Sequence, residues 1–257
     1  MGLKKCSFLI VLCISILTAC SLKKGKFIPA PNEPVTTSFT THSGLILIHA
    51  EVNGVSGTFL FDNGFSYSGM NTSFAKKANV TFNGSTSIRD ANSRTKSTQS
   101  ATVKLVEIQG QKILNTSFYQ INTDLFFPCK KIDGVIGASI INQINWKIDF
   151  ENKEIISSSK PFKEEGFPLN ILFTGNNSSL TEITVLDQTY TCKIDLGSSN
   201  GIKLDSRYSN KSFEGLSAEK ETGITSLSAH GLGQVENQFH LKTPIDLFHK
   251  GQRLPKK

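Results

Sequence analysis

Two aspartates with similar neighbours are the residues of this 257-residue sequence best placed to do chemistry. Asp62 follows the apolar run Phe59-Leu60-Phe61, Asp195 follows Ile194, and each begins the pattern Asp-x-Gly-x-Ser. A carboxylate at the end of a buried strand raises the free energy of the folded state unless it is paired or used. The pattern therefore indicates two carboxylate loops.

The alternative for the first copy is a hairpin turn, because Asn63-Gly64 supplies the positive φ angles of a type I′ turn. The second copy has Leu196-Gly197 at this place, and leucine is penalised at positive φ. The strands expected before Asp62 are already joined by a turn at Asn53-Gly54. The turn is therefore the weaker interpretation.

An internal repeat relates the two aspartates. Residues 45–66 align without a gap with residues 178–199, and Asp62 falls on Asp195. The other identical pairs are Leu47 with Leu180, Val52 with Val185, Thr58 with Thr191, Gly64 with Gly197 and Ser66 with Ser199. In each copy a strand, a turn (Asn53-Gly54 or Asp187-Gln188) and a second strand precede the aspartate, which predicts a hairpin followed by a loop.

Two such loops have a chemical use if the halves of the chain pack as a pseudo-dimer, because Asp62 and Asp195 then meet at the shared axis. Carboxylates about 3 Å apart cannot both ionise, so they hold one proton between them and titrate as a coupled pair. One member takes a proton from a water while the other donates a proton to a scissile carbonyl. Glycine lets the backbone approach closely, and a nearby serine hydroxyl can hydrogen-bond a carboxylate oxygen.

Residues 58–66 (TFLFDNGFS) and 191–199 (TCKIDLGSS) resemble the active-site loops of the aspartic proteases, and the first is similar to bacterial retropepsin-like members in particular. The resemblance implies a mainly β, two-lobed pepsin/retropepsin-like fold with a pseudo-two-fold repeat. It also implies hydrolysis of a peptide or protein substrate by the dyad Asp62 and Asp195, with no cofactor. The residues expected to support the loops are Asn63, Gly64, Ser66, Val135, Ile136, Gly137, Gly197, Ser198 and Ser199.

A second segment strengthens the resemblance. Within residues 132–155, Val135-Ile136-Gly137 is similar to the family's hydrophobic-hydrophobic-Gly strand, which crosses behind the catalytic loop. The resemblance implies that a short helix and a strand, WKIDFENKEI (residues 146–155), then close the first lobe. Residues 101–121 alternate like a two-strand meander, as the family's flap and following strands require.

Three departures from the family pattern leave a second function open. Asn63 and Leu196 stand where the family has threonine or serine; residues 87–100 offer neither a tyrosine nor a glycine-rich flap tip; and no second hydrophobic-hydrophobic-Gly segment follows residues 231–248. The second lobe is thus expected to be incomplete, as a truncated or degenerate copy or one completed by a partner chain or dimer. The alternative function is a catalytically inactive aspartic-protease-like lipoprotein that binds a peptide or protein; a structural β-sandwich is a third, which the repeat disfavours.

The first residues predict export and a lipid anchor. Two lysines precede an apolar stretch at residues 8–17, which is typical of a secretory signal peptide and shorter than the roughly 20 residues of a spanning helix. Residues 17–20 (LTAC) resemble the lipobox of bacterial lipoproteins, which implies lipidation of Cys20 and a membrane-anchored location in the bacterial cell envelope. The expected divisions are a signal peptide at 1–19, a tether or linker at 20–40, the first lobe at 41–160 and the second at 161–257.

The remaining composition excludes other classes of site. Cys129 and Cys192 are the cysteines left outside the signal peptide and the lipidation site, either bridged or as two separate buried thiols. The five histidines lack metal-ligand spacing, so no metal site is expected. The net charge of +7 is not interleaved with aromatic residues in a nucleic-acid pattern, so no nucleic-acid partner is expected; a nearby anionic membrane or a solvated tail explains the charge better.

Overall fold

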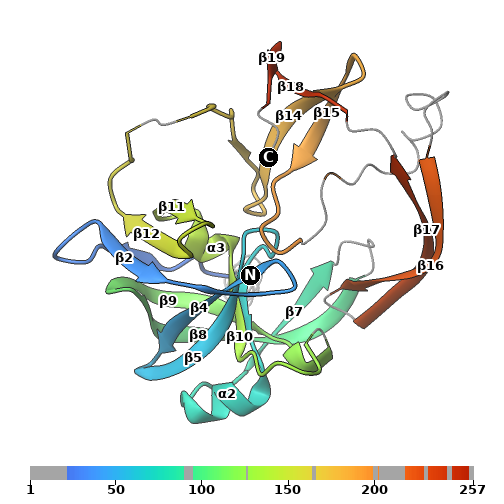
Figure 1. Ribbon diagram of the computed structural model, residues 1–257. Coiled ribbons are helices and arrows are strands. Elements are labelled where there is room, and N and C mark those ends of the chain that lie inside the picture. Colours follow the sequence, from blue (N-terminus) through green and yellow to red (C-terminus); the bar gives the residue numbers. More distant parts are fainter. Residues whose placement is uncertain are drawn as a thin grey trace, which may run out of the picture.

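The structure, a computed structural model, describes residues 22–89, 95–125, 127–163, 166–198, 202, 218–228, 231–241 and 245–254 (Figure 1). The strands at 218–228 and 231–241 are described by their backbone alone. Strands far outnumber helices, so the expected mainly β class is confirmed. Within the described residues, no helix has both the length and the apolar character needed to cross a membrane.

The largest sheet contains nine strands in the order β1-β9-β6-β10-β5-β4-β8-β7, with β3 paired to β4. Because β8 also pairs with β9, the strands β4, β5, β10, β6, β9 and β8 close into a ring. The strands of this sheet are β1 (Lys26–Ile28), β3 (Thr40–His42), β4 (Leu45–Val52), β5 (Val55–Asp62), β6 (Ser68–Met70), β7 (Gly84–Arg89), β8 (Thr95–Ile108), β9 (Gln111–Gln120) and β10 (Gly134–Gly137). The two-strand meander expected at residues 101–121 is confirmed by the antiparallel pair β8 and β9.

The hairpin of β4 and β5 carries Asp62 and forms for local reasons. Asn53 and Gly54 have φ angles of 50° and 81°, as a type I′ turn requires, and Val52 therefore pairs with Val55. Most residues of β4 and β5 are apolar, and those facing the core are buried. The hairpin thus delivers Asp62 to the end of a strand that the core holds in place.

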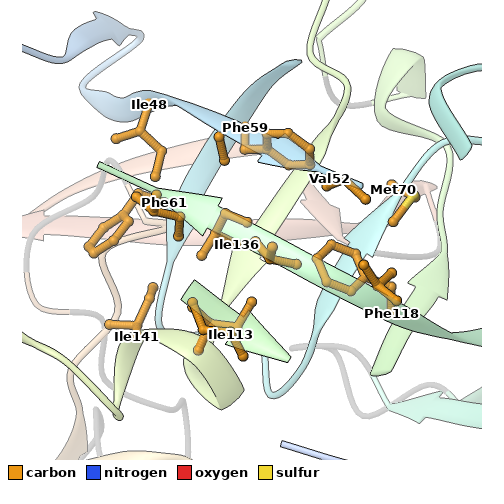
Figure 2. Close-up of a cluster of buried hydrophobic side chains, with 14 of the residues drawn as sticks. Ile48, Val52, Phe59, Phe61, Met70, Ile113, Phe118, Ile136 and Ile141 are labelled. Atoms are coloured by element: carbon orange, nitrogen blue, oxygen red, sulfur yellow. The ribbon is translucent and has the colours of Figure 1, made fainter. Parts of the chain in front are cut away.

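The main hydrophobic cluster packs against one face of β5 (Figure 2). Phe59 and Phe61 of β5 and Ile136 of β10 are fully buried in it, and the ring of Phe61 stands edge-on to Trp146 with centroids 5.0 Å apart. Full burial of one such side chain stabilises the fold by roughly 1.5–3 kcal/mol. The strand that ends in Asp62 is therefore among the most firmly held elements of the molecule.

Short helices join the strands. In α2 (Thr72–Lys77), the side chain of Asn71 accepts a hydrogen bond from the N–H of Phe74 and so caps the helix N-terminus. The 3-10 turn η1 (Thr123–Leu125) follows β9, and α3 (Ala138–Ile141) follows β10 directly and is buried along its whole length. This burial anchors the segment immediately after β10.

The segment expected to be a linker takes part in two sheets. β1 pairs antiparallel with β9, and β2 (Val35–Ser38) pairs antiparallel with β12 (Glu154–Ser158). The prolines and lysines of this segment favoured a linker, but edge strands tolerate these residues nearby. The strands that pair with β1 and β2 are about 80 to 120 residues away, so no local pattern indicated them. Residues 26–28 and 35–38 are therefore structured parts of the fold.

WKIDFENKEI, expected to form one strand, forms parts of two. β11 (Asn145–Asp149) and β12 pair antiparallel across a tight turn, and β2 lies on the other side of β12. Asp149 stabilises the turn by accepting hydrogen bonds from the main chain and side chain of Asn152. The single-strand expectation was wrong because this turn contains no glycine or proline to mark it.

A separate sheet contains the second aspartate's hairpin. Its strands are β13 (Leu172–Phe173), β14 (Ser179–Val185), β15 (Gln188–Lys193), β18 (Leu247–His249) and β19 (Gln252–Arg253). A two-stranded sheet of β16 (Ala218–Ser228) and β17 (Gly231–Leu241) completes the described elements.

The hairpins β4–β5 and β14–β15 have the same register at an offset of 133 positions. Leu47 pairs with Leu60 and Leu180 with Lys193, and the residues flanking the turn pair in the same way. The second turn therefore lies at Leu186-Asp187, with φ angles of 47° and 62°, one residue earlier than expected. Leucine adopts a left-handed conformation there because the register of the hairpin imposes it on a two-residue loop.

Candidate active site

The main chain of both aspartate loops folds in the same way. The Oδ1 atom of Asp62 accepts a hydrogen bond of 2.7 Å from the N–H of Gly64, and its carbonyl oxygen accepts one from Phe65. At Asp195, Oδ1 accepts from the N–H of Gly197 at 2.9 Å, and the carbonyl accepts from Ser198. Neither Asn63 nor Gly64 has a positive φ, so the first loop is not a type I′ turn. Each carboxyl group is thus oriented by the glycine two residues later.

The two loops approach each other reciprocally. A Cβ atom on Gly64 would overlap the carboxyl group of Asp195, and a Cβ atom on Gly197 would overlap the carboxyl group of Asp62. The two carboxyl groups are close enough for the charge of Asp195 to raise the pKa of Asp62. The structure therefore brings together the two aspartates that the repeat singled out, and it does so because each faces a residue without a side chain.

Asp62 lies in an environment that opposes ionisation. Burial raises the pKa of the Asp62 carboxyl to about 7, with a further contribution from the negative charge of Asp195. The Gly64 N–H and the charge of Lys193 act in the opposite direction and are outweighed. Asp62 is also the more buried of the two aspartates, whereas the side chain of Asp195 is 36% exposed. Below about pH 7 the neutral form of Asp62 is therefore favoured.

Asn63 joins the two loops. Its side-chain Oδ1 accepts a hydrogen bond of 2.8 Å from the main-chain N–H of Leu196, and only 7% of the residue is exposed. Asparagine thus crosses from one loop to the other at the position where the family pattern has a hydroxyl. Leu196 instead packs its side chain against the main hydrophobic cluster. The brace therefore runs in one direction only.

The strand expected behind the first loop is present. β10 lies between β5 and β6, parallel to β5, with Gly134 opposite Phe59 and Gly137 opposite Asp62. The N–H of Gly137 donates to the Ser68 hydroxyl, and a side chain on Gly137 would overlap the main chain of Tyr67. Val135 and Ile136 are buried beside β5, so this segment holds the Asp62 loop from behind.

Ser66 supports the first loop through its main chain. Its carbonyl oxygen accepts hydrogen bonds from the N–H of Ser139 and from the side chain of Asn177 at 3.0 Å. Asn177, which is 2% exposed, also accepts a hydrogen bond at its carbonyl from the side chain of Asn142. Asn177 lies just before the repeat, so sequence reasoning had no signal for this link between the two parts of the chain.

Lys193 is a second site residue that sequence reasoning missed. Its Nζ atom donates a hydrogen bond of 2.6 Å to the carbonyl of Gly64 and lies 3.8 Å from Oδ2 of Asp195. The repeat aligns Lys193 with Leu60, an apolar residue, so the alignment gave no indication of a role in the site. Its two partners lie on opposite loops.

Some expectations fall outside or against the described structure. Ser199, Cys20 and the tip of the expected flap at residues 90–94 lie outside the described residues. Among the described strands, β15 pairs with β14 alone, so no counterpart of β10 lies behind the Asp195 loop there. The incomplete second lobe expected from the sequence stays a prediction.

Cys129 and Cys192, the cysteines within the described residues, form no bridge. Cys129 is exposed and free, and Cys192 is free and partly buried, so the expectation of two buried thiols was wrong for Cys129. In the described part of the chain, no group of three or more His, Cys, Asp or Glu side chains is arranged to hold a metal ion. His249 is buried, with its ring nitrogens near the carbonyl of Glu182 and the N–H of Asn170.

Two comparisons with known proteins found a similarity. A family model described as aspartyl protease matches residues 48–140, a segment that contains Asp62 and β10. A solved structure similar to this chain is a retropepsin-like aspartic protease from Rickettsia conorii, with 18% identity, a TM-score of 0.37, and coverage of 49% of this chain and 94% of that one. A search of curated proteins found no match. The residues matched by the aspartyl protease model therefore include the first aspartate loop and the strand behind it.

Proposed function

We propose that this protein is an aspartic peptidase that hydrolyses peptide bonds with a water activated by Asp62 and Asp195. The observation that carries the proposal is the reciprocal approach of the two loops, in which each carboxyl group lies against the glycine of the other loop. Two carboxyl groups in contact, one of them with a pKa raised to about 7, provide both a base and an acid at the same pH. The family match over residues 48–140 supports the same chemistry.

The proposed reaction needs one proton on the pair at the start. The ionised carboxylate takes a proton from the water as its oxygen attacks the peptide carbonyl, while the protonated carboxyl gives its proton to the carbonyl oxygen. In the breakdown step, the amide nitrogen receives the proton taken from water, and the other carboxylate takes one back from a hydroxyl of the tetrahedral intermediate. The pair then returns to its starting state, one water having been consumed.

The decisive experiment measures peptide cleavage by the full chain and by Asp62→Asn and Asp195→Asn. Each substitution keeps the size of the side chain and removes its ability to exchange the proton, so we expect both to lose activity by at least about a hundredfold. Asp124→Asn, at an exposed position, is the matched control and should cleave normally. Cleavage that persists in both dyad variants would show that another group performs the reaction.

A second function keeps the fold without the reaction. Leu196 offers no hydroxyl for a return brace, and β15 has a single partner among the described strands. These two observations favour a peptide- or protein-binding lipoprotein whose site does not turn over. Its signature is saturable binding of peptides with no cleavage at any pH between about 3 and 8, the range over which such pairs titrate.

We further propose that the protein is anchored to a membrane of the cell envelope through lipid on Cys20. The residues LTAC at 17–20 and the apolar stretch before them support this proposal. Metabolic labelling with a radioactive fatty acid should mark the wild-type chain and not Cys20→Ser, and the variant should leave the membrane fraction. Label on Cys20→Ser would refute the assignment of the modified residue.

A further inference from the structure

A cation occupies one side of the aspartate pair. Lys193 ends β15, two residues before Asp195, and its Nζ atom lies 3.8 Å from Oδ2 of Asp195. The same ammonium group donates a hydrogen bond to the carbonyl of Gly64 in the opposite loop. Because the carbonyl of Gly64 accepts this hydrogen bond, the ammonium group of Lys193 lies beside the pair, although 39% of the side chain is exposed.

The first loop has no such cation. The residue that aligns with Lys193 is Leu60, and the two have equivalent pairing partners, Leu47 and Leu180. Leu60 is 6% exposed and packs with Leu47 and Val135 in a second hydrophobic cluster. The two loops thus have the same main-chain geometry, but the residue two positions before the aspartate is apolar in the first copy and positively charged in the second.

Among the described residues, Lys193 forms an ion pair with Asp195 and not with Asp62, so its charge favours the ionised form of Asp195 more strongly, although it also lowers the pKa of Asp62. A positive charge beside Asp195 stabilises the ionised form of that carboxyl, and the exposed side of Asp195 lets water stabilise it as well. Asp62 is more buried, and burial favours its neutral form. Among the described residues, the charged groups that act on Asp62 from the neighbouring elements are Asp195 and Lys193.

We propose that Lys193 is a positioning residue that directs the single proton of the pair to Asp62 and keeps Asp195 as the carboxylate. Building on the proposed peptidase function, this assigns the two roles: Asp195 takes the proton from the attacking water, and Asp62 donates to the substrate carbonyl. Asp62 then recovers a proton from the intermediate while Asp195 gives its proton to the leaving nitrogen. Lys193 itself keeps its protons throughout and acts through Asp195.

The experiment follows the two carboxyl groups directly. The full chain in detergent is labelled with ¹³C at the aspartate carboxyl carbon, and the two signals are assigned with Asp62→Asn and Asp195→Asn. At a pH where the pair holds one proton, the wild-type signal of Asp62 should have the shift of a protonated carboxyl and that of Asp195 the shift of a carboxylate. In Lys193→Met, both should move toward intermediate values, with the ratio of the two protonated forms falling roughly threefold, as suits a partly exposed ion pair.

Two further variants separate charge from hydrogen bonding. Lys193→Arg keeps the charge and should preserve the wild-type distribution, whereas Lys193→Gln keeps a donor for Gly64 without the charge and should behave like Lys193→Met. Unchanged signals in Lys193→Met, or a proton on Asp195 in the wild type, would overturn the proposal.

The titration requires no turnover. An inactive chain with the expected proton distribution would therefore refute the peptidase function alone, and an active chain with unchanged signals in Lys193→Met would refute the role of Lys193 alone.

Discussion

The side-chain oxygen of Asn63 accepts a hydrogen bond from the main-chain N–H of Leu196, 133 residues away in the sequence. This contact joins the two loops that carry Asp62 and Asp195. The loop of Asp62 is also held by β10, whereas among the described strands β15 pairs with β14 alone. The position of Asp195 relative to Asp62 thus depends on contacts between the loops, and this buried amide makes one of them.

Replacing Asn63 by alanine tests this dependence. The N–H of Leu196 loses its partner in a partly buried place, so the free energy of unfolding should fall by about 1–3 kcal/mol, and peptide cleavage should fall further than stability alone explains. Asn63→Ser supplies a hydroxyl acceptor and should restore part of both. Asn83→Ala, at an exposed side chain, is the control in urea unfolding and activity assays. Equal behaviour of Asn63→Ala and Asn83→Ala would show that the brace has no weight.

The two site glycines should tolerate no side chain. In Gly197→Ala the added methyl group overlaps the carboxyl of Asp62, which must move away from Asp195, so activity should be lost and the pKa of Asp62 should fall toward its ordinary value. Gly64→Ala should act on Asp195 in the same way. At Gly175 a Cβ atom meets nothing within 4 Å, so Gly175→Ala is the matched control. An active Gly197→Ala enzyme would contradict the reciprocal packing.

The raised pKa of Asp62 makes stability depend on pH in a defined direction. In the unfolded chain an aspartate titrates near about 3.9, and in the folded chain burial raises the pKa of Asp62 to about 7. The folded state binds more protons than the unfolded state between these pH values. The contribution of Asp62 to the free energy of unfolding is therefore fully present below pH ~4 and is lost as the pH rises through about 7.

The expected slope in this window is up to about 1.4 kcal/mol per pH unit from this group. Urea unfolding at a series of pH values should show the decline in the wild type and a flatter curve in Asp62→Asn, which cannot ionise. A wild-type curve that rises between pH 4 and 7 and is unaffected by Asp62→Asn would contradict the assigned pKa direction.

Asn177 offers a test of the link between the two parts of the chain. Asn177→Asp keeps a side chain that tolerates the local φ of 67° and removes the amide donor that holds the carbonyl of Ser66. We expect a loss of roughly 1–3 kcal/mol in the free energy of unfolding and reduced cleavage. Asn79, also at a positive φ of 52° but exposed, provides the control Asn79→Asp. A thermal melting curve of Asn177→Asp that matches this control would mean that the contact contributes little.

Local patterns made part of this structure predictable from the sequence. The hairpin before Asp62 follows from the apolar residues around Asn53-Gly54. The strand at Val135-Ile136-Gly137 was expected from the resemblance to the aspartic proteases, and in the structure Gly137 passes close to the main chain of Tyr67. The repeat then placed Asp195 against Asp62. The turn signal lies within the hairpin that it predicts, whereas the repeat relates two segments 133 positions apart.

The features that escaped prediction depend on partners far away in the chain. β1 and β2 are strands because they pair with β9 and β12, and no local pattern in the sequence indicates these pairings. The sequence around Lys193 gives no sign of its role, because its partner, the carbonyl of Gly64, is 129 residues away in the sequence. The turn at Leu186-Asp187 escaped because the register of the whole hairpin, and not the preference of leucine, sets its backbone.

The open edge of β15 has a consequence for how this protein can change. Among the described strands, β15 pairs with β14 alone, so β15 adds little rigidity to the Asp195 loop. Asn63 also holds that loop, from the other side of the site. Substitutions near the first loop that alter substrate preference should therefore also make the second loop less ordered. The two halves of the site form one mechanical unit, and adaptation of either half requires compensating changes in both.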